Sequence, residues 1–94
     1  MNSYETLFIV NPNCTEEEVD AEIAKVTDII ASAGEVKTTD KWGKRKLAYE
    51  INKNSEGNFV LVTFNAEPIV LEELNHIYRI TDNILRGIYV KVEE

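Results

Sequence analysis

Residues 35–64, EVKTTDKWGKRKLAYEINKNSEGNFVLVTF, hold two extended segments that stand between two helical patterns. Within residues 35–51 the apolar side chains change parity after Gly43, and such a change at a glycine indicates a β-bulge or a bend. Residues 54–57 have the composition of a turn, and residues 59–64 have the composition of a second strand. The stretch therefore predicts a β-hairpin with a long first strand, and the rest of the fold is arranged around it.

A strand and a helix precede the hairpin. Residues 4–10, YETLFIV, are rich in aromatic and β-branched side chains of both parities, which predicts a central strand. Thr15 and Glu18 have the spacing of a capping box, and apolar side chains then recur at helical spacing. This pattern predicts a helix over residues 15–33, which we expect Gly34 to end.

A second helix and a last strand follow the hairpin. Pro68 suits a first helical turn, and apolar side chains at helical spacing predict a helix that ends near residues 82–83. Residues 84–92 have the alternation of a strand. The order β-α-β-β-α-β is that of the ferredoxin-like α+β fold, a four-stranded antiparallel sheet with two helices on one face. We expect residues 1–94 to form a single domain.

The charge of the chain is acidic but uneven. The formal net charge is -7, yet five of the ten basic residues lie within residues 41–53, whereas acidic side chains crowd residues 16–28. An acidic balance counts against nonspecific binding to polyanions, although it leaves room for a local basic site. The apolar runs are too short to span a membrane, and a single cysteine excludes an intrachain disulfide, so we expect a cytosolic protein.

The sequence offers little support for catalysis. His76, the only histidine, falls in the second expected helix near two glutamates, where a surface position is a better explanation than a general base. Cys14 has no histidine near it in the sequence, and the glutamates that follow it oppose a thiolate. One cysteine and one histidine cannot form a usual zinc site, and no glycine-rich phosphate loop is present. We therefore expect no enzymatic activity, no metal and no cofactor.

The basic cluster is the most informative feature for function. In an extended segment Lys44, Arg45 and Lys46 project from both sides of the strand. Lysines can neutralise phosphates, whereas an arginine can grip a phosphate with two hydrogen bonds or stack on a base. Trp42 and Tyr49 offer planar surfaces nearby, and this combination is used in RNA recognition. The alternative is a hairpin whose lysines protect a sheet edge and whose aromatic residues pack in the core.

Motifs along nearly the whole chain match one protein family. The most specific is residues 42–51, WGKRKLAYEI, and the others are Tyr4-Glu5, Asn11-Pro12-Asn13, Gly57, Phe59 and residues 79–86, RITDNILR. With these motifs the chain resembles the bacterial ribosomal protein S6 family, whose fold is the ferredoxin-like one. The resemblance implies a structural protein of the cytoplasmic ribosome. Such a protein forms a heterodimer with the small basic ribosomal protein S18 and binds small-subunit ribosomal RNA in the platform during assembly.

The resemblance also implies which side chains meet each partner. Trp42 and Tyr49 are assigned to packing or to the protein partner. The RNA-side candidates are Tyr4, Lys44, Arg45, Lys46, Lys53, Arg79, Arg86 and Lys91. In this interpretation the protein has no small-molecule substrate and no contact with a membrane. A second hypothesis is a regulatory domain of the same fold that binds a small molecule on its open sheet face or at a dimer interface.

Overall fold

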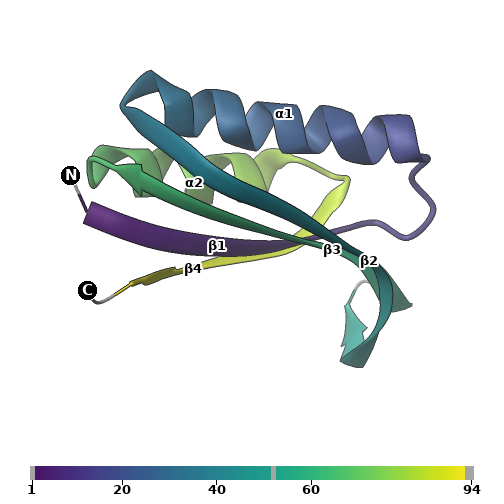
Figure 1. Ribbon diagram of the computed structural model, residues 1–94. Coiled ribbons are helices and arrows are strands. Elements are labelled where there is room, and N and C mark those ends of the chain that lie inside the picture. The colour runs from purple at the N-terminus through teal and green to yellow at the C-terminus, as the bar shows by residue number, and fades with distance from the viewer. Residues whose placement is uncertain (1, 52, 93–94) are drawn as a thin grey trace.

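The computed structural model describes residues 2–51 and 53–92 (Figure 1). Within these residues an antiparallel sheet with the strand order β2-β3-β1-β4 has both helices on one face (Figure 1). The elements are β1 (Asn2–Val10), α1 (Glu16–Ser32), β2 (Gly34–Ile51), β3 (Asn54–Ala66), α2 (Ile69–Ile80) and β4 (Ile84–Lys91). This arrangement confirms the ferredoxin-like fold, and β1 is a central strand, as its composition predicted.

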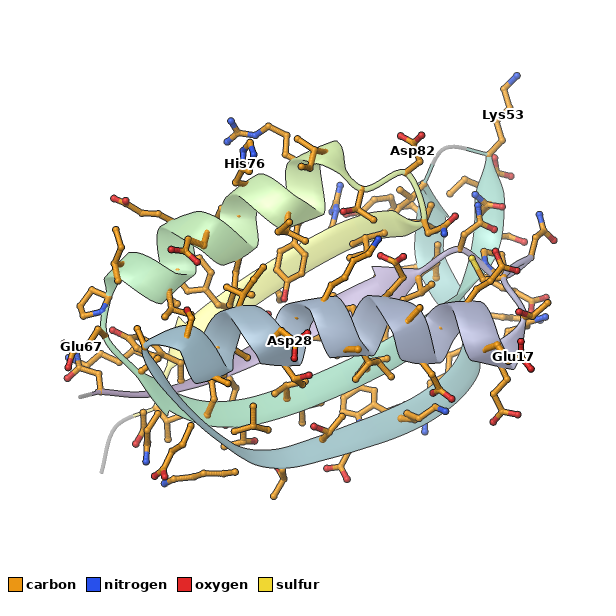
Figure 2. The ribbon with its side chains drawn as sticks, turned by 90° about the horizontal axis from the view of Figure 1, so that it is seen from above. Glu17, Asp28, Lys53, Glu67, His76 and Asp82 are labelled. Atoms are coloured by element: carbon orange, nitrogen blue, oxygen red, sulfur yellow. The ribbon has the colours of Figure 1, made fainter. Side chains whose placement is uncertain are left out.

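The two helices lie side by side over the sheet (Figure 2). The capping box of α1 is present, because the Thr15 hydroxyl accepts from the Glu18 amide at 3.2 Å and the Glu18 carboxylate accepts from the Thr15 amide at 3.0 Å. The second helix, α2, follows Pro68 and ends at Ile80, slightly before the predicted end, because Thr81 has an extended backbone. In the described part of the chain, neither helix is long and apolar enough to cross a membrane.

Two glycines in β2 have different physical roles. Gly43 has a φ of +80° and lies at a shift of the β2–β3 register, which confirms the predicted bulge. Gly34 follows the C-cap Ala33, so α1 ends where the sequence predicts, but Gly34 has no positive φ and is the first residue of β2 rather than a left-handed cap. A Cβ atom at Gly34 would lie 2.2 Å from the Asn65 carbonyl oxygen. Gly34 is therefore required by the close approach of β3.

The turn of the hairpin lies earlier than the sequence predicted. Ile51 pairs with Asn54, so the chain reverses between them, and Lys53 there has a φ of 66°. The expected turn residues, which end at Gly57, belong instead to β3. Packing against β1 explains the glycine at position 57, because a Cβ atom at Gly57 would lie 2.3 Å from Cγ2 of Ile9.

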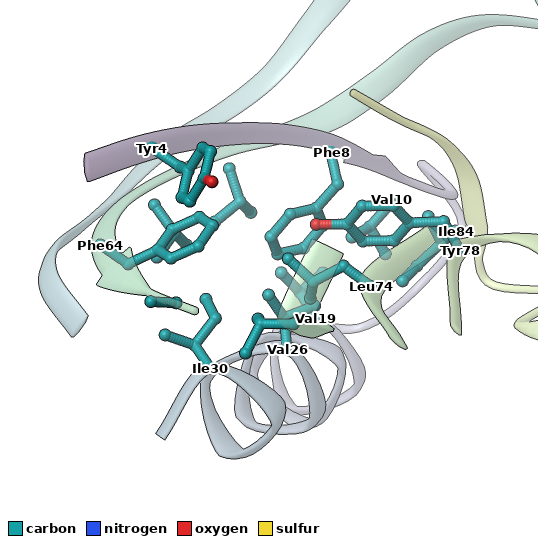
Figure 3. Close-up of a cluster of buried hydrophobic side chains, with 14 residues drawn as sticks. Tyr4, Phe8, Val10, Val19, Val26, Ile30, Phe64, Leu74, Tyr78 and Ile84 are labelled. Carbon is teal, nitrogen blue, oxygen red and sulfur yellow. The ribbon is translucent and has the colours of Figure 1, made fainter. Parts of the chain in front are cut away.

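The hydrophobic core lies between the sheet and the helices (Figure 3). Phe8 of β1 and Phe64 of β3 point toward the helices, where they meet a layer that includes Val26 of α1 and Leu74 of α2 (Figure 3). All four side chains are fully buried. The side chains of opposite parity in β1 and β3 therefore face the open side of the sheet.

Tyr78 of α2 places a hydroxyl group inside this core. Its Oη atom lies 2.7 Å from Oγ1 of Thr6, which in turn donates to the Ile88 carbonyl at 2.8 Å. Because the threonine hydroxyl has a single hydrogen, Tyr78 is the donor of the first bond. Burial raises the pKa of Tyr78 to about 12.

We expect Tyr78 to destabilise the protein between about pH 10 and pH 12. In this range the unfolded phenol loses its proton while the folded one keeps it, so the unfolded state binds fewer protons and stability falls as the pH rises. Urea unfolding at about pH 9 and about pH 11.5 should show a loss about 2 kcal/mol larger in the wild type than in Tyr78→Phe. Equal losses in the two proteins would contradict the burial of an ionisable phenol.

Candidate nucleic-acid interface

The end of the β2–β3 hairpin extends beyond the rest of the sheet. The pairing of β1 with β3 ends at Val10 and Asn58, so the hairpin beyond this point has no third strand beside it. After the bulge at Gly43 the hairpin bends away from the helical layer (Figure 1), and Lys53 lies at its tip (Figure 2). We call residues 44–51 and 53–57 the hairpin arm.

Four of the predicted RNA-side residues lie on the hairpin arm. Lys44, Arg45, Lys46 and Lys53 are all exposed, and none forms an ion pair with another described residue. Arg45 pairs with Gly57, whereas its two lysine neighbours pair with the residues on either side of that glycine. Because side chains alternate along a strand, Arg45 projects from one side of the arm and the lysines from the other. The arm therefore presents positive charge on both sides.

Trp42, just before the arm, belongs to a small stack of side chains. Its ring is nearly parallel to that of Phe59, with the centroids 6.2 Å apart and an angle of 9° between the planes. The guanidinium carbon of Arg45 lies 5.3 Å from the centroid of the Trp42 ring, and its Nε donates to the Trp42 carbonyl at 3.4 Å. Trp42 remains 41% exposed, so it packs against the strand and still holds Arg45 at the surface.

Tyr49 and Arg86 join the hairpin arm to the open face of the sheet. Nη1 of Arg86 donates to the Tyr49 hydroxyl, and the guanidinium carbon lies 5.5 Å from the centroid of the tyrosine ring. Arg86 is opposite Ile9 of β1, on the far side of the sheet from the helices. This contact adds an exposed cation to the arm. We call the five cations together the basic arm surface, and they are Lys44, Arg45, Lys46, Lys53 and Arg86.

The other three candidates lie away from this surface. Tyr4 is only 5% exposed, and its ring packs against Phe64 with the centroids 5.7 Å apart, which gives it a packing role. Lys91 is opposite Tyr4, at the other end of β4 from Arg86, and five strand residues span about 17 Å. Arg79 is exposed on α2, in the helical layer. We therefore leave these three residues out of the basic arm surface.

Lys41, at the base of the arm, has a different role from the other lysines. Its Nζ atom lies 2.6 Å from a carboxylate oxygen of Asp20 and 3.7 Å from one of Glu16, both on α1. The hydrogen bond and the charge of Asp20 raise the pKa of Lys41. This lysine therefore links β2 to α1, and nothing in the local sequence distinguishes it from its neighbours.

The open face of the sheet has an exposed apolar patch. Ile88 and Val90 of β4 are 53% and 55% exposed. Together with Leu7 and Leu61 they line a shallow hollow of about 190 Å³, which also has Glu5 at its wall. Exposed apolar patches of this kind are typical of surfaces that bind another protein. We call the four apolar residues the open-face patch.

The residues considered for catalysis do not come together in the described part of the chain. His76 is exposed on α2, and burial together with the charges of Glu18 and Glu22 raises the pKa of the Cys14 thiol, which disfavours the reactive thiolate. Among residues 2–51 and 53–92, no three histidine, cysteine, aspartate or glutamate side chains are placed to hold a metal ion.

Comparisons with known proteins lead to one family. The family model described as Ribosomal protein S6 matches residues 3–91. The small ribosomal subunit protein bS6 of Clostridium acetobutylicum is 45% identical over 95 residues and the two chains cover each other fully. The bS6 protein of Clostridium beijerinckii is 52% identical over 91 residues, which is 96% of each chain.

A solved structure has the same architecture. The crystal structure of 30S ribosomal protein S6 from Thermotoga maritima is similar to this chain with a TM-score of 0.91 and 34% identity. The match covers 97% of this chain and 87% of that one. The family model, the identities over the full length and the shared fold agree with the sequence motifs, and the chain therefore belongs to the ribosomal protein S6 family.

Proposed function

We propose that the protein binds small-subunit ribosomal RNA in the platform through its basic arm surface, together with ribosomal protein S18. Its family makes it a structural component of the small subunit of the cytoplasmic ribosome rather than an enzyme. The observation that supports the RNA contact is the basic arm surface itself. Its five cations are exposed and form no ion pair with another described residue, so they are available to phosphates.

The arm can bind RNA although the chain has a net charge of -7. Charges separated by more than about 10 Å are screened at moderate salt, so the acidic surface of α1 acts weakly on a phosphate at the tip of the arm. Arg45, which lies over the Trp42 ring, can donate two hydrogen bonds to one phosphate or stack on an unpaired base. The lysines on the other side of the arm act as point charges.

The open-face patch is the surface that we assign to S18. It is apolar at its centre, and Glu5 at its wall offers a carboxylate to a basic partner. Trp42 stacks on Phe59 of β3, and Tyr49 of the arm contacts Arg86 of β4. A protein that extends from the patch toward the arm would therefore also meet Trp42 and Tyr49. A small-molecule ligand is not favoured there, because the hollow of about 190 Å³ is smaller than the usual 300 to 1,000 Å³ of ligand pockets.

Binding to a small-subunit RNA fragment, measured with and without S18 over a range of salt, tests the proposal. We expect tight binding only with S18. We also expect the affinity to fall steeply with salt, because each phosphate contact adds about 0.7 to 0.9 to the magnitude of the slope of log K against log salt. Lys53→Ala should lower the magnitude of this slope by roughly that amount. Equal affinity without S18 would argue against the partnership, and an unchanged slope would remove Lys53 from the RNA surface.

A further inference from the structure

A hollow of about 520 Å³ lies in the helical layer, on the other side of the sheet from the open-face patch. Glu22 and Lys25 of α1 form one wall, Ile77 and Ile80 of α2 form another, and residues 81–83 between α2 and β4 close one end. Figure 2 shows this layer from above, with Asp82 at the end of α2. We call this feature the helix-side hollow.

Glu22 gives the helix-side hollow an unusual chemical property. The residue is 4% exposed, which is rare for a glutamate on an amphipathic helix. Its Oε1 accepts from Nζ of Lys25 at 3.1 Å, whereas its Oε2 is buried without a hydrogen-bond partner among the described residues. Buried carboxylate oxygens normally meet a donor. Glu22 therefore brings a buried acceptor without a described donor to the wall of the hollow.

The charges around the hollow favour a cation. Lys25 balances Glu22, so the carboxylate of Asp82 leaves one negative charge in excess. The C-terminal end of α2 adds the partial negative charge of its last carbonyl groups, although Arg79 in the same turn offsets part of it. A metal ion does not fit, because the described residues include no group of three metal-ligating side chains. The ligand is therefore an organic cation that donates hydrogen bonds.

The apolar wall narrows the choice of cation. Ile80 is 57% exposed, and with Ile77 it offers a surface for the methylene groups of a long side chain. A guanidinium is more weakly hydrated than an ammonium and donates from several nitrogens, so it can reach two carboxylates at once. Glu22 and Asp82 line the same hollow, so a guanidinium is the cation best suited to donate to both carboxylates.

We propose that the helix-side hollow binds an arginine side chain from a basic polypeptide, whose guanidinium donates to Glu22 and Asp82 and whose methylene groups lie on Ile77 and Ile80. Binding needs a rotamer change that turns the Glu22 carboxylate toward the hollow and a movement of the half-exposed Lys25 side chain, because Oε2 has almost no exposed surface in the unbound protein. The net negative charge of the protein favours the approach of a basic segment. The binding site is separate from the basic arm surface, so it does not depend on the proposed RNA contact.

A titration of the folded protein with two short peptides, followed by amide chemical shifts, tests this site. The probe is acetyl-Gly-Arg-Gly-amide, and its control replaces arginine with citrulline, which has nearly the same shape and no charge. We expect saturable shifts around residues 22–25 and 77–83 with the arginine peptide alone. Glu22→Gln should weaken its binding at least about tenfold. Glu17→Gln removes the same charge from an exposed position at the start of α1 and should bind like the wild type (Figure 2).

Three results would overturn the proposal. They are equal shifts with arginine and citrulline, an equal loss of affinity in both variants, and no saturable shifts in the hollow. If the Glu22→Gln chain does not fold, the comparison of the two peptides on the wild type decides alone. None of these outcomes bears on RNA binding, which the hairpin arm variants test independently.

Discussion

Replacing Gly34 with alanine should destabilise the protein by about 3 kcal/mol or more, which is a large effect for one added methyl group. The new Cβ would lie 2.2 Å from the Asn65 carbonyl oxygen and 2.7 Å from Cα of Ala66. Both atoms belong to the backbone of β3, so no side chain can move aside. Relief would require β2 to separate from β3 at the point where Ala33 accepts from the Glu67 amide at 3.1 Å. Urea unfolding of both proteins measures the loss.

Gly43→Ala is the matched control for this prediction. Gly43 is in the same strand and has a φ of +80°, but a Cβ atom there would have no neighbour within 4 Å. We expect a cost of only about 1 kcal/mol, from the left-handed backbone alone. The two variants therefore separate crowding from backbone conformation. If Gly43→Ala cost as much as Gly34→Ala, the close approach of β3 would not be the reason for the glycine at position 34.

The parts of the fold that the sequence predicts are those set by local patterns. The capping box of Thr15 and Glu18 marks the start of α1, and the helical spacing of apolar residues marks both helices. The sequence does not reveal why Gly34 and Gly57 are glycines, because a glycine required by a neighbouring strand looks the same in the sequence as one required by its own backbone. Only the sheet pairing separates these two reasons.

The candidate interface, like the fold, is predictable from the sequence only where local patterns determine it. The run of basic residues around Arg45 was evident, and its exposure supports the prediction. The resemblance to the family implies an RNA-side role for Tyr4, whereas the structure buries its side chain in the core. The sequence alone does not tell which parity of β1 faces the helices, because both parities are apolar. The contact of Tyr49 with Arg86 and the burial of Glu22 depend on elements far apart in the chain. Local patterns contain no signal for either.

Reversing the charges of Arg45 and Lys46 together should weaken the binding of RNA by the complex with S18 by about 150-fold, or about 3 kcal/mol. The two side chains lie on opposite sides of the hairpin arm, so the double variant Arg45→Glu/Lys46→Glu removes one cation from each side and adds two repulsive charges. Both residues are exposed and form no salt bridge with a described acid, so we expect the fold to tolerate the change. Lys46 is opposite Glu56 in the strand pairing, so Lys46→Glu brings two like charges together, and the stability of the variant is measured alongside its binding. Fluorescence anisotropy of a labelled RNA fragment at fixed salt measures the loss.

The control reverses two lysines at the other end of the sheet. Lys37 of β2 and Lys91 of β4 are both exposed. Lys91 is opposite Tyr4, which is opposite Phe64. Lys37 follows Val36, which is opposite Phe64 from the other side. Lys37→Glu/Lys91→Glu changes the net charge by the same amount, but at a distance from the arm over which salt screens most of the interaction. We therefore expect a loss of only a few fold. An equal loss in the two double variants would mean that RNA responds to the total charge of the protein, or that it also contacts Lys91. A loss confined to the arm variant would support local placement of charge as the reason an acidic protein binds RNA.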